Sequence, residues 1–407
     1  MTTNFFSAPL IAWLSLLIWV ILLVARGGFW RAQPVRALAA TTITDVGNKE
    51  ISDRGAWPAL VAVVPARNEA DVIGRAVGSL LKQDYPGPFH VIVVDDDSTD
   101  GTATAAAATA RDLDLEDRVT VLTANPLPPG WSGKVWAQSQ GIDAVAKLDL
   151  SAEFLLLTDA DIHHPADAVT QLVARAILED RDLVSLMVRL RCDSLWEKAL
   201  IPAFVFFFAK LYPFAWVSDV RKATAGAAGG CMLVRRSALV EAGGIESIRH
   251  ELIDDCSLAQ RIKHRRGKGQ ARPIRLDLAE ASESLRPYDS WRDIWNMIAR
   301  TAFTQLRYSP FLLAGTVIGM FLIYLVPPLF ALSMGTLAWP AWAAWILMCI
   351  AYTPMLRYYR RSILWAPTLP LIALFYVSAT IGSAVRYWTG KGGQWKTRVQ
   401  APSQSDS

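Results

Sequence analysis

The chain has 407 residues and a net charge of +4, which is too small to indicate a nucleic-acid partner. Hydrophobic residues make up 52% of it, and 16 residues are tryptophan, a side chain that favours membrane interfaces. Together with the length, this composition predicts a soluble domain of ordinary size combined with membrane segments. The four cysteines lack the spacing of a zinc site or a disulfide framework.

The first element is an apolar run over Leu10–Val24, close to the length of a membrane-spanning helix. No lysine or arginine precedes this run, and three arginines follow it: Arg26, Arg31 and Arg36. A cleavable signal peptide carries its positive charge before the apolar run. We therefore predict an uncleaved anchor over residues 1–36, with the N-terminus outside and the rest of the chain in the cytoplasm. A polar linker is predicted over 37–57.

Residues 58–308 are predicted to form one α/β domain. Five short apolar runs are typical of buried strands: 59–64, 89–94, 119–123, 154–158 and 183–188. Four helical patterns lie between them: 70–83, 101–113, 134–146 and 166–179. Because strands that alternate with helices form parallel sheets, we expect a Rossmann-like, mostly parallel and doubly wound sheet.

Residues 193–217, inside this domain, form a strongly aromatic segment that is too short for a spanning helix. Two interpretations stay open. The segment is either an interfacial helix that presses the domain onto the bilayer, or a buried core helix.

Three apolar segments follow within residues 309–386: Phe311–Phe330, Trp339–Tyr352 and Leu364–Ala384. Three arginines separate the last two and are predicted to be cytoplasmic: Arg357, Arg360 and Arg361. Prolines interrupt the last segment, which therefore either spans the membrane or folds back. We predict two or three C-terminal membrane helices, a cytoplasmic C-terminus and a polar tail over 387–407.

Two of the predicted strands end in carboxylates. The second leads into Asp95, Asp96 and Asp97, and the fourth into Asp159 and Asp161. In an open α/β sheet, ligands bind beyond the carboxyl ends of the strands. Mg²⁺ is often held by a few carboxylates together with substrate phosphates, so this pattern predicts a pocket for a divalent cation and a phosphorylated nucleotide. A single aspartate at such a position could instead cap the following helix.

Each carboxylate is expected to have its own role. Asp96 would accept hydrogen bonds from a uracil or a ribose, Asp159 would bind the ribose, and Asp161 would ligate Mg²⁺ or Mn²⁺ between the two phosphates. His163 and His164 follow closely, either as a late metal ligand or as ordinary loop histidines.

The end of the first strand carries residues that could contact a nucleotide. Pro65 is expected to end the strand, and Arg67 and Glu69 lie where a base and a ribose could be clamped. A strand followed by a helix N-terminus is the alternative explanation. Lys134 could meet a diphosphate as a point charge, or could be a solvated lysine at a helix start.

Later in the domain, Gly229 and Gly230 permit close approach of a ligand to the backbone, or form an ordinary tight turn. Asp254 and Asp255 open a helix, whose dipole favours ionised carboxylates. We expect Asp255 to be a general base and Asp254 to cap the helix. Arg307 would hold a leaving diphosphate, or anchor the chain at the lipid interface.

Taken in order, these motifs resemble the family 2 glycosyltransferases of GT-A fold. The matching segments are Pro65–Glu69, Val94–Asp100, Asp159–Asp161, Gly229–Gly230 and Asp254–Leu258. The resemblance covers residues 58–308. It implies a metal-dependent, inverting transfer from a nucleotide-sugar, usually a UDP-sugar. Residues 185–214 and 300–310 are similar to the hopanoid-biosynthesis-associated membrane glycosyltransferases of bacteria.

The chain departs from the family pattern in two places. Asp254 stands where the family often has glutamate, and residues 305–308 replace the Gln-x-x-Arg-Trp of processive polysaccharide synthases, so we expect a single transfer. We predict an enzyme of the bacterial inner membrane that moves a sugar to a lipid, with a hopanoid as candidate acceptor. The alternatives are transfer to polyprenyl phosphate or a cell-envelope glycan, and a non-catalytic nucleotide- or lipid-binding membrane protein.

Overall fold

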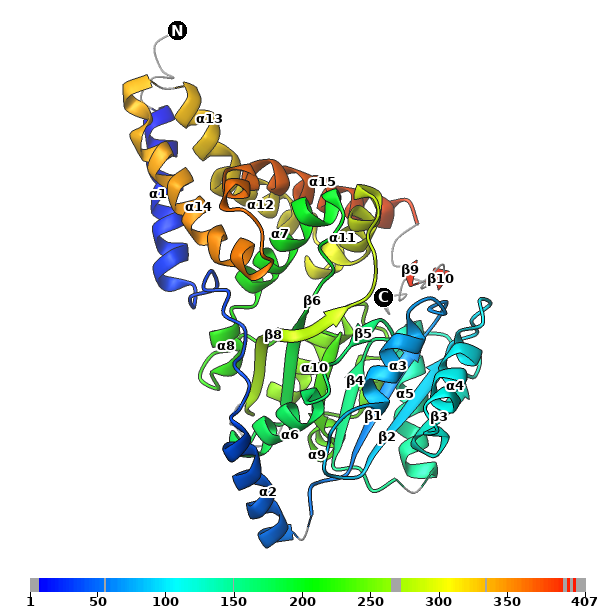
Figure 1. Cartoon of the computed structure of the whole chain (residues 1–407). Helices are drawn as coiled ribbons and strands as arrows, with labels where there is room; N and C mark the ends of the chain where they lie inside the picture. Colours follow the sequence, from blue (N-terminus) through cyan, green and yellow to red (C-terminus); the bar gives the residue numbers. More distant parts are fainter. Residues whose placement is uncertain are drawn as a thin grey trace. The chain divides into compact units, whose positions relative to one another are not determined.

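A computed structural model describes residues 7–54, 56–148, 150–264, 272–333, 335–390, 394–395 and 398–399. The chain divides into two compact units, shown in Figure 1. The α/β unit comprises 34–191, 216–287 and 394–407, and the helical unit comprises 1–33, 192–215 and 288–393. Residues 192–215 and 288–308 therefore belong to the helical unit, whereas the sequence placed them in the α/β domain.

The α/β unit is built on one eight-stranded sheet of order β3-β2-β1-β4-β7-β6-β8-β5. Its strands are β1 (Leu60–Ala66), β2 (Phe89–Asp95), β3 (Val119–Thr123), β4 (Phe154–Thr158), β5 (Ile162–His163), β6 (Leu183–Arg189), β7 (Cys231–Arg235) and β8 (Ile274–Ser284). Strands β3, β2, β1 and β4 are parallel, and β6 is parallel to β8. Strand β7 is antiparallel to β4 and β6, and β5 to β8. The prediction of a mostly parallel α/β sheet is confirmed.

Strand β1 continues through Pro65, which pairs with Val94 of β2. The expectation that Pro65 ends the strand is therefore wrong. On its other side, β1 pairs with β4 only as far as Val63, so the proline interrupts no ladder bond to β4.

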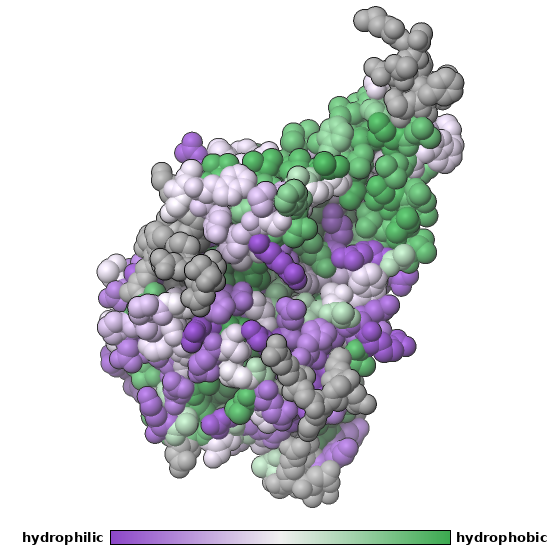
Figure 2. Space-filling view, turned by 180° about the vertical axis from the view of Figure 1, so that it is seen from behind, coloured by the Kyte–Doolittle hydropathy of each residue, from purple (hydrophilic) through white to green (hydrophobic). Residues whose placement is uncertain are grey.

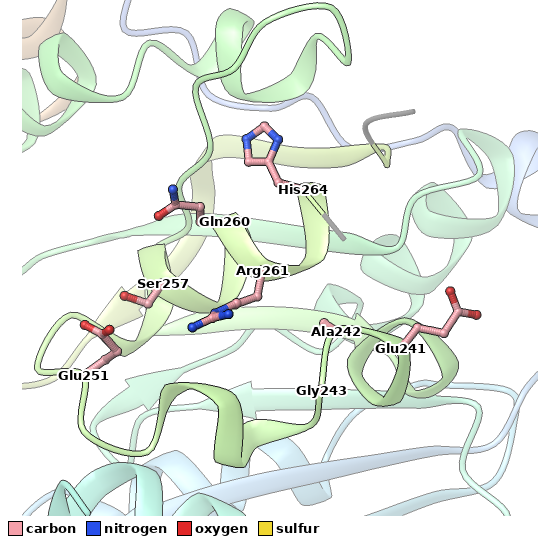
Figure 3. Close-up of a pocket in the computed structure, with 8 residues that line it drawn as sticks. All are labelled: Glu241, Ala242, Gly243, Glu251, Ser257, Gln260, Arg261 and His264. Atoms are coloured by element: carbon pink, nitrogen blue, oxygen red, sulfur yellow. The ribbon is translucent and has the colours of Figure 1, made fainter. Parts of the chain in front are cut away.

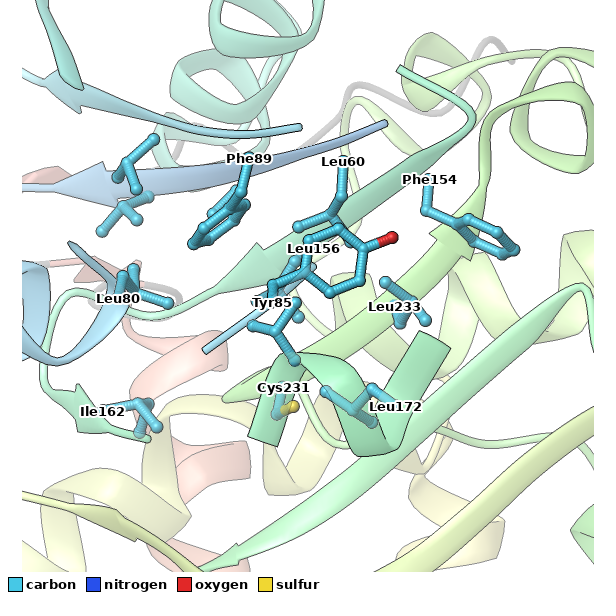
Figure 4. Close-up of a cluster of buried hydrophobic side chains, with 14 of the residues drawn as sticks. Leu60, Leu80, Tyr85, Phe89, Phe154, Leu156, Ile162, Leu172, Cys231 and Leu233 are labelled. Carbon is cyan, nitrogen blue, oxygen red and sulfur yellow. The ribbon is translucent and has the colours of Figure 1, made fainter. Parts of the chain in front are cut away.

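Helices pack on both faces of this sheet. One face is covered by α3 (Ile73–Leu81), α4 (Thr102–Asp112) and α6 (Ala168–Leu178), whose apolar side chains share one core with alternate residues of β1, β2 and β4. Figure 4 shows the centre of this core around Leu60, Leu156 and Leu233. Helix α5 (Gly133–Lys147) packs on β1 and β2 at Gly141, where a Cβ would lie 2.5 Å from Val63 Cγ1.

The predicted linker over 37–57 contains helix α2 (Ala40–Arg54), which belongs to the α/β unit. Val46 of this helix and Trp57 after it are buried in the main core. The backbone N–H of Leu38 donates to Gln171 Oε1 of α6 at 2.7 Å. The polar composition of residues 37–57 predicted a linker, but buried apolar side chains attach this segment to the α/β unit.

The remaining elements of the α/β unit are short. They are η1 (Glu116–Arg118), α9 (Arg236–Glu241), η2 (Ile245–Ile248), α10 (Asp254–Lys263), β9 (Gln394–Trp395) and β10 (Arg398–Val399). Helix α8 (Phe214–Ser218) lies in the sequence where the chain passes from one unit to the other. Most of the tail predicted over 387–407 lies outside the described residues.

The helical unit contains α1 (Ser7–Ala25), α7 (Leu195–Leu211), α11 (Trp291–Gln305), α12 (Pro310–Met320), a π-helical turn (Phe321–Leu325), α13 (Val326–Ser333), η4 (Gly335–Ala338), α14 (Trp339–Tyr358), η5 (Ile363–Thr368) and α15 (Leu369–Trp388). Among the residues that the structure describes, three helical stretches are long and apolar enough to cross a membrane: Pro310–Ser333, Trp339–Tyr358 and Ile363–Trp388. The apolar part of α1, Leu10–Ala25, is shorter. Figure 2 shows a nearly continuous hydrophobic surface over these helices.

Helix α1 is attached to the first of these stretches by two polar contacts. Ser15 Oγ donates to the carbonyl oxygen of Leu322, and Trp19 Nε1 to that of Ile323, both at 2.8 Å. Both carbonyls lie in the π-helical turn. Hydrogen bonds of this kind fix one helix against another where apolar surface alone gives little specificity in lipid.

Helix α7 is a core helix of the helical unit. Its apolar residues from Leu200 to Ala209 are mostly buried, and Phe206 and Phe207 contact the rings of Tyr352 and Tyr376. Tyr376 Oη also donates to the carbonyl oxygen of Leu200 at 2.9 Å. Of the two interpretations of residues 193–217, these contacts favour the core helix, and they explain why the segment groups with α14 and α15.

Candidate active site

Asp255 is the second residue of α10, and backbone N–H groups hold both of its carboxylate oxygens. Oδ2 accepts from Gly229 at 2.8 Å, and Oδ1 accepts from Cys256 at 2.7 Å. The residue before the helix is Ile253, which makes no side-chain cap. Asp254 lies within the first turn, so the expectation that Asp254 caps the helix is wrong.

Lys134, in the first turn of α5, connects the two acidic segments. Its Nζ lies 2.8 Å from Asp159 Oδ1 and 3.2 Å from Asp254 Oδ2. A Cβ on Gly229 would lie 3.1 Å from this Nζ and 3.4 Å from Asp255 Oδ2. The structure thus brings Lys134, Asp159, Gly229 and Asp255 together, and a side chain at Gly229 would press against the Lys134 ammonium group.

Burial, followed by the charge of Asp254, raises the pKa of Asp255 to about 6, against the opposing effects of Lys134 and the two N–H donors. The position at a helix N-terminus had suggested a strongly acidic group, and burial outweighs it. A carboxylate with this pKa is mostly ionised at neutral pH, as a general base must be. Burial alone would lower the pKa of Lys134, but Asp159 and Asp254 raise it, so Lys134 remains a cation.

Asp161 has a cationic partner that sequence reasoning missed. Arg286 Nε donates to Asp161 Oδ2 at 3.0 Å, and Arg286 Nη2 bonds to Glu69 Oε1. Ser284 Oγ also donates to Asp161 Oδ2 at 3.0 Å. The antiparallel pairing of β5 with β8 places Ile162 opposite Ser284 and so brings Arg286 to this point. An arginine two residues beyond a strand end was the only signal in the sequence.

The loops after β1 and β2 are fastened to each other. Arg67 Nη1 donates to the carbonyl oxygen of Asp96 and lies 3.4 Å from Asp96 Oδ2. The N–H of Glu69 donates to Thr102 Oγ1 at 2.9 Å. Arg67, Glu69 and Asp96 are all buried. The three residues predicted to contact the nucleotide therefore lie in the same pair of loops, and Arg67 holds Asp96 in place.

Other predicted residues have different surroundings. A Cβ on Gly230 would lie 3.0 Å from Val188 Cγ2 and 3.3 Å from Ile162 Cδ1, so this glycine serves internal packing. Arg307 follows α11 in the helical unit, with a left-handed φ of 51°. Its proposed contact with a diphosphate stays a prediction. His164 is buried and both of its ring nitrogens lie near hydroxyl groups, which argues against a metal ligand.

The carboxylates fit a hard divalent cation. Among the described residues, no group of three or more His, Cys, Asp and Glu side chains could hold a metal by itself. Mg²⁺ is commonly held by one or two carboxylates and completed by substrate phosphates and water. Asp161 provides such a carboxylate, with Arg286 as its present partner.

The α/β unit also has a hollow of about 460 Å³ beside α10. Figure 3 shows its lining, which comes from α9, the loop after it and α10, and includes Glu251, Arg261 and His264. None of the predicted site residues lines it. The candidate chemistry is therefore at the N-terminal end of α10, around Asp255.

Comparison with known proteins gives a family for part of the chain. The model of glycosyl transferase family 2 matches residues 61–243, which include Asp96, Lys134, Asp159 and Gly229. The chain carries a family 2 glycosyltransferase domain. The match ends before Asp255 and Arg286, so their assignment rests on the contacts described above.

Two curated relatives match parts of this chain. It is 27% identical over 222 residues to a beta-monoglucosyldiacylglycerol synthase from Nostoc sp., covering 53% of this chain and 42% of that protein. It is 29% identical over 141 residues to an N-acetylglucosaminyltransferase from Azorhizobium caulinodans, covering 34% and 33%. The chain thus spans less than half the length of these relatives.

Solved structures similar to this chain include the mannosyltransferase PcManGT from Pyrobaculum calidifontis in complex with GDP-Man and Mn²⁺. The TM-score is 0.48 at 18% identity, with 97% of this chain and 96% of that chain covered. For glucosyl-3-phosphoglycerate synthase from Mycobacterium tuberculosis with Mg²⁺ and UDP, the TM-score is 0.43 at 19% identity, covering 68% and 85%. The sheet order, the helices on both faces and the family match make the α/β unit a GT-A fold.

Proposed function

We propose that this protein transfers a sugar from a UDP-sugar to a hydroxyl group of a membrane lipid, with inversion at the anomeric carbon. The observation that carries the proposal is the meeting of Lys134, Asp159 and Asp255 in one place. A cation for a diphosphate and a carboxylate with a pKa of about 6 lie together there. These are the two groups that a hydroxyl acceptor and a departing nucleoside diphosphate require.

The donor would bind along the carboxyl ends of β1, β2 and β4. Asp96, held by Arg67, would accept hydrogen bonds from the uracil or the ribose, with Glu69 beside it. Asp159 would bind the ribose, and Lys134 would turn from Asp159 to the diphosphate as a point charge. Mg²⁺ or Mn²⁺, held by Asp161, would supply charge neutralisation of the diphosphate when bound.

Asp255 would act on the acceptor. The N–H of Gly229 fixes one carboxylate oxygen, so the carboxylate has a defined direction before the acceptor arrives. The acceptor hydroxyl attacks the anomeric carbon from the face opposite the diphosphate. Its proton passes to Asp255 as the new glycosidic bond forms and the bond to the diphosphate breaks.

The lipid nature of the acceptor is supported by three candidate spanning helices in the same chain. It is also supported by the likeness to a protein named for glucosylation of diacylglycerol. The hopanoid-associated resemblance makes a hopanoid alcohol the first acceptor to test. Arg26, Arg31 and Arg36 follow α1, so the catalytic unit would face the cytoplasm of a bacterial inner membrane.

The proposal can be tested with full-length protein in lipid nanodiscs. UDP- and GDP-sugars would be offered with a hopanoid alcohol, diacylglycerol or polyprenyl phosphate, and products identified by mass spectrometry. We expect transfer from a UDP-sugar to a hydroxyl lipid, lost in EDTA and in Asp161→Ala, and retained in the control Asp112→Ala at an exposed carboxylate. Full activity in EDTA or in Asp161→Ala would contradict the metal assignment. Transfer only to polyprenyl phosphate would establish the alternative acceptor.

The membrane orientation has a separate test. Alkaline phosphatase fused after residue 57 should be inactive, because the enzyme needs an oxidising compartment, whereas green fluorescent protein fused there should fluoresce. The reverse pattern would place the catalytic unit outside the cytoplasm and would remove its access to nucleotide-sugars.

A further inference from the structure

Three buried side chains form a hydrogen-bonded line behind the candidate base. Thr158, the last residue of β4, donates from Oγ1 to the carbonyl oxygen of Gly230 at 2.7 Å. The same Oγ1 lies 3.0 Å from His164 Nε2, and His164 Nδ1 lies 3.3 Å from Ser282 Oγ of β8. Thr158 and His164 are each 1% exposed and Ser282 is 3% exposed, so water cannot replace these partners.

The positions of the protons follow from counting donors. A carbonyl oxygen can only accept, so Thr158 must spend its single hydroxyl proton on Gly230. Thr158 Oγ1 can then only accept from His164, which requires the proton of the neutral ring on Nε2. His164 Nδ1 is left as an acceptor, and the hydroxyl of Ser282 is its donor. Every polar atom on the line is satisfied with one neutral tautomer.

A neutral ring agrees with its surroundings. Burial, and then the nearby His163, lower the pKa of His164 to about 4, so the ring is neutral near neutral pH. The ring is also held from its backbone, because the N–H of His164 donates to Ser79 Oγ at 3.1 Å. The three side chains therefore keep one hydrogen-bonding pattern, with His164 neutral.

This hydrogen-bonded line ends on the turn that holds Asp255. Gly230, which accepts from Thr158, directly follows Gly229, whose N–H donates to Asp255 Oδ2 at 2.8 Å. On the other side of the turn, the N–H of Ala228 donates to Ser185 Oγ at 2.9 Å. The peptide that aims its N–H at the base is thus fixed from both sides.

We propose that Thr158 and His164 are positioning residues, which hold the Gly229–Gly230 turn so that the Gly229 N–H orients the carboxylate of Asp255. The proposal rests on the proposed function only in taking Asp255 as the base. The geometric part concerns the turn itself and can be measured without any substrate.

Thr158→Val keeps the shape of the side chain and removes the hydroxyl, whereas Thr158→Ser keeps the hydroxyl. Hydrogen–deuterium exchange of the peptide containing Gly229 and Gly230 should be about tenfold faster in Thr158→Val, the scale of one lost hydrogen bond. Exchange in Thr158→Ser should match the wild type. Unchanged exchange in Thr158→Val would overturn the proposal, whether or not the protein proves to be a glycosyltransferase.

With an active acceptor, the same variants give a catalytic readout. Thr158→Val should lower kcat about tenfold with little change in the donor KM, again the scale of one hydrogen bond. It should also move the acidic limb of the kcat profile to higher pH, because a looser Gly229 N–H stabilises the Asp255 carboxylate less. A loss of kcat with an unmoved pH limb would assign Thr158 to packing and overturn the positioning role.

A second position guards against a folding defect in Thr158→Val. His164→Gln offers an amide N–H to Thr158 and an amide oxygen to Ser282, whereas His164→Leu offers neither. We expect His164→Gln to stay near the wild type in exchange and in pH profile, and His164→Leu to follow Thr158→Val. Equal behaviour of the two His164 variants would overturn the proposal.

Discussion

The two units of this protein hold their basic side chains in different ways. In the α/β unit, Lys134 pairs with Asp159 and Asp254, and Arg286 pairs with Asp161 and Glu69. In the helical unit, Arg26 donates to the carbonyl oxygens of Lys210 and Leu211 at the end of α7. Lys210 itself lies over the rings of Phe207 and Tyr324, at 5.4 and 4.6 Å from their centroids.

This difference separates a site from a scaffold. A phosphate oxygen can replace a carboxylate as the partner of a lysine or an arginine, because both are anionic oxygens of similar geometry. A backbone carbonyl at a helix end and an aromatic face belong to the fold and cannot be replaced without loosening it. We therefore expect substitutions in the first group to change binding and chemistry, and those in the second to change stability.

Among these substitutions, the largest effect is expected at Asp255, the candidate general base. Asp255→Asn keeps the size of the side chain and removes its basicity, so kcat with a hydroxyl acceptor should fall by about 10²–10⁴-fold. UDP binding, followed by calorimetry, should stay near the wild-type value. A near-normal kcat with the true acceptor would mean that the base is another residue or that the acceptor is a phosphate.

Lys134→Met should have the next largest effect, on nucleotide affinity. Loss of a charged hydrogen bond to the diphosphate should weaken UDP binding by about 10- to 100-fold. Lys147→Met, at an exposed position in the last turn of the same helix, is the matched control and should bind UDP normally. If Lys134→Met binds UDP as the wild type does, Lys134 only joins the carboxylates and belongs with the scaffold.

The pH dependence tests the same neighbours by another route. Because Asp255 must be ionised to accept a proton and its pKa is raised to about 6, kcat should be constant near neutral pH and should fall below about pH 6. Lys134 lowers this pKa by its charge, so in Lys134→Met the acidic limb should move to higher pH. If the acidic limb of the kcat profile does not move in Lys134→Met, the charge of Lys134 does not affect the pKa of Asp255.

Arg286→Gln should have a smaller effect, on metal binding without nucleotide. A cation that ligates Asp161 must displace Arg286, whose side chain is 32% exposed, and such partly exposed ion pairs contribute little. We expect Mn²⁺ alone to bind about two- to fivefold more tightly to Arg286→Gln, as followed by electron paramagnetic resonance. Weaker binding would instead show that Arg286 helps to shape the metal site.

The smallest effect on activity is expected in the helical unit, at Trp19→Phe. This change removes the hydrogen bond to the carbonyl of Ile323 and should cost about 1 kcal/mol of stability. The Tm of the helical unit in detergent should fall by about 2–4 °C, the scale for a folding unit of about 150–250 residues, with unchanged kcat per folded molecule. Trp388→Phe, where the ring is 56% exposed, is the control. A changed kcat in Trp19→Phe would break the division into site and scaffold.

The sequence alone was sufficient for five of the eight strands in the main sheet, because their signal is local. Apolar runs of five or six residues with turn residues at their ends gave β1, β2, β3, β4 and β6 to within two residues. The acidic strand ends gave the location of Asp96, Asp159 and Asp161 for a similar reason, since parallel strands end at one edge of a sheet. The family resemblance then narrowed the chemistry that this edge could perform.

Several features depended on contacts between distant segments, and no local pattern announces these. The pairing of β5 with β8 brought Arg286 to Asp161, and the pairing of β4 with β7 brought Thr158 beside the glycine turn. Burial, which depends on the whole packed unit, raised the pKa of Asp255 above what a helix N-terminus suggests. Helix α7 is likewise a core helix, because it packs against segments more than a hundred residues further along the chain. A local sequence pattern cannot show such packing.

By itself, the sequence determined which residue types stand at the strand ends and which stretches are apolar enough to span a membrane. Those properties follow from hydrophobic periodicity and charge over a few neighbouring residues. Only the tertiary structure decided which charges meet, which histidine is buried and which glycine makes room for the base. Distances between side chains are set by the packing of many elements at once, so they exist only in the folded chain.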